Sequence, residues 1–243
     1  MKSLKIALLG YGKMGKEIEK IAIEKSHTII ARIDNSDDWI EQEKQLQEAD
    51  IAIEFSIPET VLDNISRCFK MNLPIIVGTT GWYHEMEKVE EECKSNNASM
   101  LWASNFSIGM NIFFKINTML AQLTDKFPEY KAHIHEIHHT QKLDAPSGTA
   151  IAIANGIIGN SKTLDSWELT NDAKHSSTNI LPITYERLGQ VPGTHKVTYQ
   201  SEIDELSIKH EAKNRKGFAA GAVLAAEWLM GRKGFYSMVD VLK

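Results

Sequence analysis

Cysteine is scarce in this chain of 243 residues, which contains only Cys68 and Cys93. Two cysteines cannot build the disulfide framework that stabilises small secreted domains, so we expect a reducing, cytoplasmic location. Long apolar runs are also missing, because no window approaches the roughly 18 consecutive apolar residues of a transmembrane helix. The apolar stretch after Met1 is too short for a secretory signal peptide, and we interpret it as the first strand. These absences argue against a membrane partner.

An excess of basic residues is the next absence. The chain has 27 lysines and arginines against 32 aspartates and glutamates, which gives a formal net charge of -5 and a pI near 6.0. No overall positive field is therefore available to attract nucleic acid. The fractions of hydrophobic residues (42%) and charged residues (24%) are ordinary for a globular protein. We expect two modest domains and a small-molecule partner.

Short β-branched runs alternate with amphipathic segments over the first hundred residues. This alternation predicts βαβ units on a parallel sheet. After the first run, Met14, Ile18 and Ala22 recur at helical spacing and predict a helix that covers the sheet. Another helix start is indicated by Ser56 before Pro58, since proline is tolerated in a first helical turn. The predicted strands are Lys5–Leu9, Thr28–Ile33, Asp50–Phe55, Pro74–Val77 and Met100–Ala103.

From about Ser107 the pattern changes and predicts a second domain. An apolar helix is expected over Ile108–Leu123, and another helix opens near Ser147. The tail Gly217–Met230 is rich in alanine and predicts a buried helix that returns to the first domain. Runs separated by turn residues predict further strands at Leu181–Tyr185, His195–Tyr199 and Glu205–His210.

A glycine-rich turn follows the first predicted strand directly. In Gly10-Tyr11-Gly12-Lys13-Met14-Gly15 the glycines permit a tight turn, admit a pyrophosphate to the backbone and let the helix pack on the strand. The anion would then meet the N-terminus of the helix. Asp34 follows Gly15 by 19 residues, where a carboxylate binds the ribose hydroxyls. The glycine motif alone is a weak indicator, and the position of Asp34 favours dinucleotide binding over an ordinary turn.

Two further loops lie at the carboxyl ends of predicted strands, the edge at which open α/β sheets bind ligands. They are Gly78-Thr79-Thr80-Gly81 and Ala103-Ser104-Asn105-Phe106. Small residues there let the backbone approach a flat nicotinamide ring, although each loop taken alone also fits an ordinary turn. Asp34 repels a 2′-phosphate, so NADH should be accepted readily, although the nearby Arg32 could offset part of that repulsion. The residues themselves therefore leave the choice between NADH and NADPH open.

The densest chemistry lies in the segment from His133 to Thr149, which contains four histidines and Lys142. Its stretch His135-Glu136-Ile137-His138-His139 matches the HExxH pattern of zinc proteases, in which two histidines one helical turn apart bind the metal. That hypothesis needs a helix, and Ile134 and Ile137 offer part of a helical stripe. Against it, the histidines at 133 and 135 alternate with apolar residues as in a half-exposed strand, and no third ligand is identified.

The competing hypothesis for this segment is acid–base chemistry beside an anion site. Imidazole and ammonium groups deliver protons and stabilise developing negative charge, and crowded cations lower one another's pKa values toward neutrality. The turn Ser147-Gly148-Thr149, which precedes an apolar helix, should present backbone N–H groups and hydroxyls to a carboxylate. Such a cluster suits a dianionic substrate, whereas the plainest alternative for each histidine is a solvated surface residue.

One long string of residues carries a family resemblance. Glu136-Ile137-His138-His139, Lys142 and Asp144-Ala145-Pro146-Ser147-Gly148-Thr149-Ala150 resemble the motif of the 4-hydroxy-tetrahydrodipicolinate (dihydrodipicolinate) reductase family. The resemblance implies an α/β fold with a Rossmann-type dinucleotide-binding domain (1–106 plus 217–243) and a second, mixed α/β domain for substrate binding and tetramerisation (107–216). It extends to Gly10 through Gly15, Gly78 through Gly81, Asn105-Phe106-Ser107, Arg187, Gly189, Pro192-Gly193, His195, Gly221-Ala222 and Trp228-Leu229.

The resemblance also implies residue roles and a reaction. His138 matches the family's proton-donating histidine, Lys142 its catalytic lysine and His139 a substrate-binding residue, while Gly148 and Thr149 match the pair that binds a substrate carboxylate. The implied reaction of lysine and diaminopimelate biosynthesis reduces a cyclic imine dicarboxylate to tetrahydrodipicolinate with NADH or NADPH and without a metal. The implied cofactor-binding residues are Gly10, Gly12, Lys13, Met14, Gly15, Asp34, Gly78, Thr79, Thr80, Ala103, Ser104, Asn105 and Phe106.

One departure from the family pattern concerns the cofactor. Many relatives have an arginine after the ribose-binding acid, where a guanidinium can bind a 2′-phosphate, and this chain has Asn35. The loss of that charge predicts that NADH is used at least as well as NADPH. The additional histidines His133 and His135 are not required by the family motif, and we assign them no role.

Overall fold

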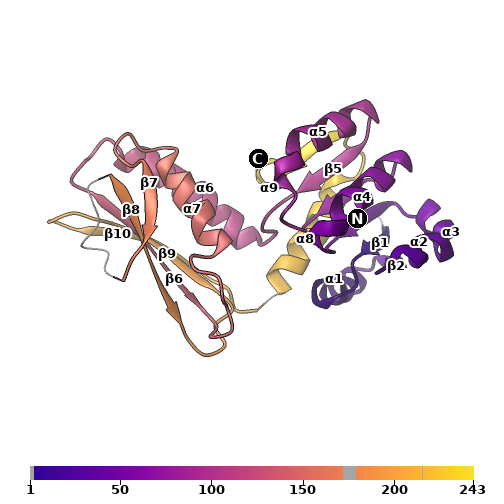
Figure 1. Ribbon diagram of the computed structural model, residues 1–243, viewed down its shortest axis with the longest axis horizontal. Helices are drawn as coiled ribbons and strands as arrows, with labels where there is room; N and C mark the ends of the chain where they lie inside the picture. Colours follow the sequence, from indigo (N-terminus) through magenta and orange to yellow (C-terminus); the bar gives the residue numbers. More distant parts are fainter. Residues whose placement is uncertain (1–2, 172–178, 215) are drawn as a thin grey trace. The chain divides into compact units, whose positions relative to one another are not determined.

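The computed structural model describes residues 3–171, 179–214 and 216–243 of the chain (Figure 1). They form two compact units, Met1–Ile108 with Lys216–Lys243 (unit 1) and Gly109–Arg215 (unit 2). These boundaries lie within two residues of the divisions implied by the family resemblance. Among the described residues, no helix combines the length and the apolar character needed to cross a membrane.

Unit 1 is built on a six-stranded sheet in the order β11-β5-β4-β3-β1-β2. Each pairing between neighbouring strands is parallel. The order of strand addition reverses between β1 and β3, and open α/β sheets bind ligands at the carboxyl edge of such a reversal. The strands are β1 (Lys5–Leu9), β2 (Thr28–Ile33), β3 (Ile51–Glu54), β4 (Ile75–Val77), β5 (Ser99–Trp102) and β11 (Gly234–Ser237).

Helices cover both faces of this sheet. In β1, Ile6 and Leu8 pack into the core beneath α1 and α8, whereas Ala7 and Leu9 face the core beneath α4 and α5. Burial on both faces explains why these strands are continuously apolar rather than alternating. The helices are α1 (Lys13–Glu24), α2 (Ser36–Glu41), α3 (Glu43–Gln47), α4 (Pro58–Lys70), the short 3₁₀ turn η1 (Tyr83–Glu85), α5 (Met86–Ser95), α8 (Lys216–Leu229) and α9 (Met238–Val241).

The five predicted strands of unit 1 are all present, and the alanine-rich tail forms α8, which packs against α1 as expected. The start of α4 differs from the prediction. Ile57 precedes its first residue Pro58, and no side chain caps this end. The hydroxyl of Ser56, which was expected to start the helix, instead contacts the buried carboxylate of Glu54. The last strand, β11, was not predicted.

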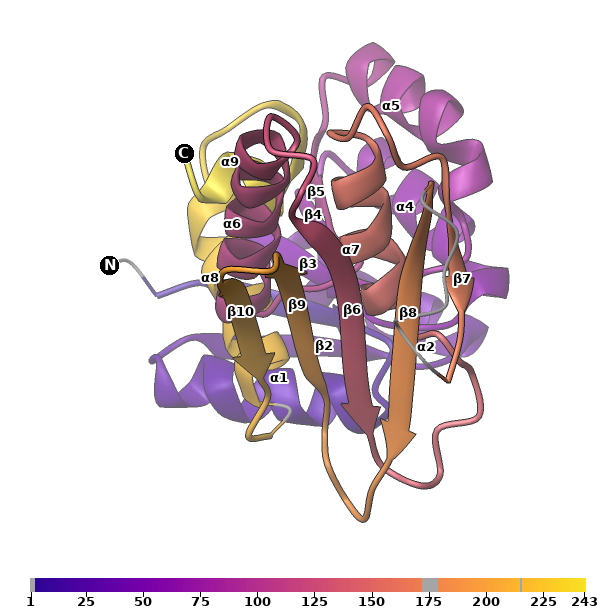
Figure 2. The ribbon, with the colours of Figure 1, turned by 90° about the vertical axis from the view of Figure 1, so that its left-hand side faces the viewer.

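Unit 2 is a mixed sheet of five strands in the order β10-β9-β6-β8-β7, with helices behind it in the view of Figure 2. Strand β9 is antiparallel to β10 and β6, whereas β6, β8 and β7 run parallel. The elements are α6 (Ile108–Thr124), β6 (Lys131–His138), α7 (Gly148–Ile158), β7 (Ser166–Leu169), β8 (Ile180–Arg187), β9 (Thr194–Gln200) and β10 (Glu205–Glu211).

Strand β6 is the central strand of unit 2 and carries the histidine-rich segment. Ile134, Glu136 and His138 are buried on the face beneath the helices, and they alternate with the partly exposed His133 and His135. The period of two is that of a strand. The helical zinc-protease arrangement is therefore wrong for this segment, because its two histidines are not one helical turn apart.

Candidate functional site

The glycine-rich turn of unit 1 links β1 to α1 at the carboxyl edge of the sheet. The N–H of Gly10 donates to the carbonyl of Ile33 at 2.7 Å, and its φ of +91° is a conformation that side chains rarely adopt. A Cβ at this position would lie 2.3 Å from the carbonyl oxygen of Phe55. At Gly12, by contrast, a Cβ would have no neighbour within 4 Å. The turn thus leaves open space in front of the N-terminus of α1, which is the arrangement that accepts a pyrophosphate.

Asp34 follows β2 and lies beside this turn. Its Oδ1 accepts a hydrogen bond from the N–H of Tyr11 at 2.8 Å, and the carboxylate is exposed. The next side chain, Asn35, caps α2 by accepting from the N–H groups of Asp37 and Asp38. The neighbouring Arg32 forms an ion pair with Glu19 rather than projecting alone beside Asp34.

A cavity of about 290 Å³ begins at the turn and runs past Asp34. Its lining contains three of the predicted cofactor residues, Gly10, Gly12 and Asp34, together with Trp39 and Arg67. A larger hollow of about 750 Å³, whose lining also includes Trp39 and Arg67, contains none of the predicted residues. The predicted residues that do not line the first cavity are Lys13, Met14, Gly15, Gly78, Thr79, Thr80, Ala103, Ser104, Asn105 and Phe106.

Phe55, which was not singled out from the sequence, brings three of the edge loops together. It follows β3, and a Cβ at Gly78 after β4 would lie 2.2 Å from its ring. Its ring centroid also lies 5.6 Å from that of Phe106 after β5. The glycine at 78 is therefore needed for close packing of side chain on backbone. An aromatic residue directly after a buried strand was the signal that could have identified it.

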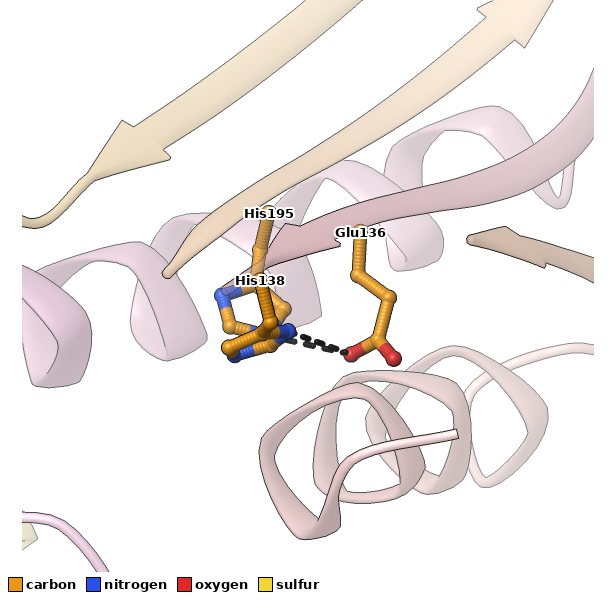
Figure 3. Close-up of side chains that lie close together, drawn as sticks. All are labelled: Glu136, His138 and His195. Carbon is orange, nitrogen blue, oxygen red and sulfur yellow. Dashed lines mark ion pairs between the residues drawn. The ribbon is translucent and has the colours of Figure 1, made fainter. Parts of the chain in front are cut away.

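In unit 2, the candidate site centres on Glu136, whose side chain is completely buried. Both of its oxygens accept from the N–H of Ser147, at 3.1 and 3.2 Å. The guanidinium of Arg187 lies 3.4 Å from Oε1. The imidazoles of His138 and His195 approach the same oxygen, Oε2, at 3.5 and 3.6 Å (Figure 3). Strands β6, β8 and β9 and the start of α7 thus converge on one carboxylate.

This convergence determines the charges within the cluster. Burial by itself would raise the pKa of Glu136, but the adjacent side chains of His195 and Ser147 and the charge of His138 lower it to about 2. Burial lowers the pKa of His138 to about 4, with Glu136 opposing the shift and His195, Lys142 and Arg187 adding to it. Glu136 is therefore the permanent anion of the cluster, and His138 is neutral at neutral pH in the unliganded protein.

The N-terminus of α7 lies directly against this carboxylate. Ser147 is its N-cap residue, and its hydroxyl accepts from the N–H of Ala150 at 3.1 Å and lies 3.2 Å from Nε2 of His195. The N–H groups of Gly148 and Thr149 belong to the first turn, where a helix supplies no acceptor of its own. Free N–H groups of this kind can bind a carboxylate, and that role stays a prediction for these two residues.

The loop after β6 carries the predicted lysine. The ammonium of Lys142 is bound by both carboxylate oxygens of Asp144 at 2.8 Å. Arg187 holds the backbone of the same loop, since its guanidinium donates to the carbonyls of Lys142 at 3.2 Å and Asp144 at 2.7 Å. Arg187 therefore fixes the lysine-bearing loop and the central carboxylate of Glu136 at once.

The structure thus gathers most of the residues predicted for acid chemistry and substrate binding within unit 2. His138 and the turn before Gly148 meet at Glu136, Lys142 lies on the adjoining loop, and His139 follows β6 directly. Sequence reasoning gave no role in the reductase to Glu136, His195 or Arg187, although all three belong to the motifs noted there. Their shared partner becomes visible only when strands far apart in the chain pair.

Glu136, His138 and His195 also place three potential metal-ligand atoms within 4.8 Å of one another. The surroundings oppose a cation at this point. The guanidinium of Arg187 already lies 3.4 Å from the carboxylate, and the N–H of Ser147 occupies both oxygens. A metal would have to displace these donors and bear the repulsion of a buried positive charge. The arrangement is that of a hydrogen-bonded acid cluster.

Comparison with known proteins gives a consistent family assignment. A family model described as dihydrodipicolinate reductase, N-terminus, matches residues 4–106, and one described as dihydrodipicolinate reductase, C-terminus, matches residues 109–242. The 4-hydroxy-tetrahydrodipicolinate reductase of Christiangramia forsetii is 44% identical over 98% of this chain and 98% of its own. That of Rickettsia bellii is 34% identical over 96% of this chain and 91% of its own.

A solved structure shares the fold. It is a dihydrodipicolinate reductase from Paenisporosarcina sp. TG-14 with dipicolinate bound, and it matches this chain with a TM-score of 0.79 at 22% identity. The match covers 97% of this chain and 98% of that one.

Proposed function

We propose that this chain, which belongs to the dihydrodipicolinate reductase family, reduces 4-hydroxy-tetrahydrodipicolinate to tetrahydrodipicolinate with a reduced nicotinamide dinucleotide. The observation that carries the proposal is the buried cluster around Glu136, in which an imidazole and the N-terminus of α7 adjoin one carboxylate. The first supplies a proton and the second binds an anion, and reduction of an unsaturated dicarboxylate needs both.

In this proposal His138 and Lys142 are the acid groups. When bound, the reduced nicotinamide supplies a hydride to C4 of the ring, after the 4-hydroxyl has left as water. His138 then delivers the proton to the adjacent carbon, and Lys142 stabilises the charge that develops. The substrate carboxylates bind His139 and the N–H groups of Gly148 and Thr149. A dianion beside His138 would raise the low pKa of that imidazole and so favour its protonation in the complex.

The cofactor in this proposal binds unit 1 along the turn Gly10 to Gly15, with Asp34 on the ribose hydroxyls. The loops at Gly78 to Thr80 and Ala103 to Phe106 would flank the nicotinamide. NADH should serve at least as well as NADPH, because Asn35 is engaged as a helix cap and Arg32 is paired with Glu19. We also propose, from the family resemblance, a cytoplasmic homotetramer assembled through unit 2, which size-exclusion chromatography with light scattering would test.

The direct test is to follow oxidation of NADH and NADPH by absorbance with freshly prepared substrate, with and without EDTA. We expect substrate-dependent oxidation that EDTA does not change. A nucleotide-sensing protein that only retained the dinucleotide fold would bind NADH without oxidising it, and that result would refute the reductase. Activity lost to EDTA and restored by metal alone would instead favour a metalloenzyme.

A further inference from the structure

Glu136 has no part in the reaction as proposed above, yet residues of three strands and of the start of α7 adjoin its carboxylate. Its carboxylate accepts from the N–H of Ser147 at the start of α7 and from Arg187 at the end of β8, and the imidazoles on β6 and β9 lie 3.5 and 3.6 Å from it. The side chain is completely buried, so a solvated surface role is excluded. A buried carboxylate that accepts from several donors fixes the geometry of those donors, since leaving any of them unpaired is costly.

The orientation of His138 gives this contact a chemical meaning. Its Nδ1 lies 3.5 Å from Oε2 of Glu136, which leaves Nε2 as the nitrogen available to a ligand. Gly193 keeps that nitrogen open, because a Cβ there would come to 3.1 Å from Nε2. An imidazolium with its Nδ1–H toward the carboxylate can release the proton on Nε2 to carbon. It then remains as the neutral imidazole with Nδ1–H still facing Glu136.

The basic groups around His138 act in the opposite direction. His195 on β9, Lys142 on the adjoining loop and Arg187 on β8 all disfavour a proton on this imidazole. Glu136 is the acidic group that opposes them in the cluster. Removal of the Glu136 charge should therefore lower the pKa of His138, so that a smaller fraction of this imidazole carries a proton at a given pH.

We propose that Glu136 is the positioning residue of the acid site, which holds His138 with Nε2 toward the substrate, keeps its proton in place, and anchors the Ser147 turn that binds the substrate carboxylate. This inference rests on the proposed function for the identity of the proton acceptor. The contacts that support it belong to unit 2 alone.

The test compares the pH dependence of kcat for the wild type, Glu136→Gln and Glu186→Gln. Because His138 must carry a proton to act, kcat falls as the pH rises through its pKa in the substrate complex. In Glu136→Gln this fall should begin about one to three pH units lower, the effect of losing an opposite charge within a few ångströms. Inhibition by dipicolinate should also weaken, while the Kd for NADH stays unchanged.

Glu186→Gln is the matched control. Glu186 lies 3.6 Å from Nε2 of His135, so the variant removes a carboxylate from beside another histidine of β6 at nearly the 3.5 Å that separates Glu136 from His138. It should keep the wild-type pH profile. An unshifted profile in Glu136→Gln, with or without a lower kcat, would reduce Glu136 to a structural residue and overturn the proposal. An equal shift in both variants would do the same.

A second variant decides the question if Glu136→Gln does not fold. His195→Gln removes an imidazole that competes for the same carboxylate oxygen, so the fall of kcat should move to higher pH. An unchanged profile or a shift to lower pH would contradict the proposal. An NMR titration of the His138 imidazole, in the free protein and with dipicolinate bound, measures the same change in pKa without requiring turnover. A Glu136-dependent pKa of His138 in a protein without reductase activity would count against the proposed function and not against this inference.

Discussion

At the glycine-rich turn of unit 1 the binding groups are backbone N–H donors, and the site exists because side chains are absent. Around Glu136 in unit 2 the groups are side chains from three strands and the backbone N–H of Ser147 at a helix start, and the site exists because they share one buried carboxylate. The first site is compact in sequence and tolerates no added atom at Gly10. The second is assembled from distant segments. Substitutions should therefore act on binding and fold in unit 1, and on chemistry in unit 2.

The largest expected effect tests the proposed acid chemistry of unit 2. His138→Ala should reduce kcat by roughly 10²–10⁴-fold, the contribution of a single proton-transfer group, and Lys142→Ala by roughly 10²–10³-fold, the contribution of one group that stabilises developing charge. The Kd for NADH, measured by fluorescence titration, should not change, because both residues belong to unit 2. His133→Ala is the matched control, since it removes an imidazole from the same strand and should leave kcat near the wild-type value. Wild-type turnover in His138→Ala would remove that residue from the mechanism.

The next largest effect tests the glycine-rich turn of unit 1, where the backbone forms the site. Gly10→Ala should lower the free energy of unfolding by at least about 1–2 kcal/mol, because φ is +91° and the added Cβ would meet the carbonyl of Phe55 at 2.3 Å. Gly12→Ala adds the same atom where nothing lies within 4 Å, so the melting temperature should not fall. It should nevertheless weaken NADH binding about tenfold, by occupying the space of the pyrophosphate. Unchanged NADH binding in Gly12→Ala would place the cofactor elsewhere.

The same contrast explains what could be predicted from the sequence. The strands of unit 1, the turn from Gly10 and the position of Asp34 were accessible because local spacing determines them. In unit 2 the strand β6, the start of α7 and the family motif were accessible, but the meeting of Glu136 with Arg187 and His195 depends on the pairing of β6 with β8 and β9. No local period encodes that pairing. The HExxH match was misleading because its spacing indicates a metal site only in a helix, and this segment forms the strand β6.

A smaller effect tests the cofactor preference at the edge of the unit 1 site. The kcat/KM with NADPH should not exceed that with NADH by more than about tenfold, or ~1.4 kcal/mol. Asn35→Arg should shift the ratio toward NADPH by about the same factor, since it adds a guanidinium beside Asp34 where a 2′-phosphate would lie. Asn35→Ala is the control, because it removes the helix cap without adding charge. A strong NADPH preference in the wild type would indicate another cation, and Arg67 in the cavity lining is the first to substitute.

The smallest expected effect is that of removing metal ions. Prolonged dialysis against EDTA should leave kcat unchanged, even though Glu136, His138 and His195 have the composition of a metal site. The carboxylate already accepts a hydrogen bond from the N–H of Ser147 and lies 3.4 Å from the guanidinium of Arg187. A metal ion bound here would gain one anionic ligand, but the N–H of Ser147 and the guanidinium would both lose their acceptor. Activity that disappeared with EDTA and returned only with zinc would mean that Arg187 moves away from the cluster. Unit 2 would then hold a metal centre. The contrast between the backbone site of unit 1 and a proton-delivering site of side chains in unit 2 would no longer hold.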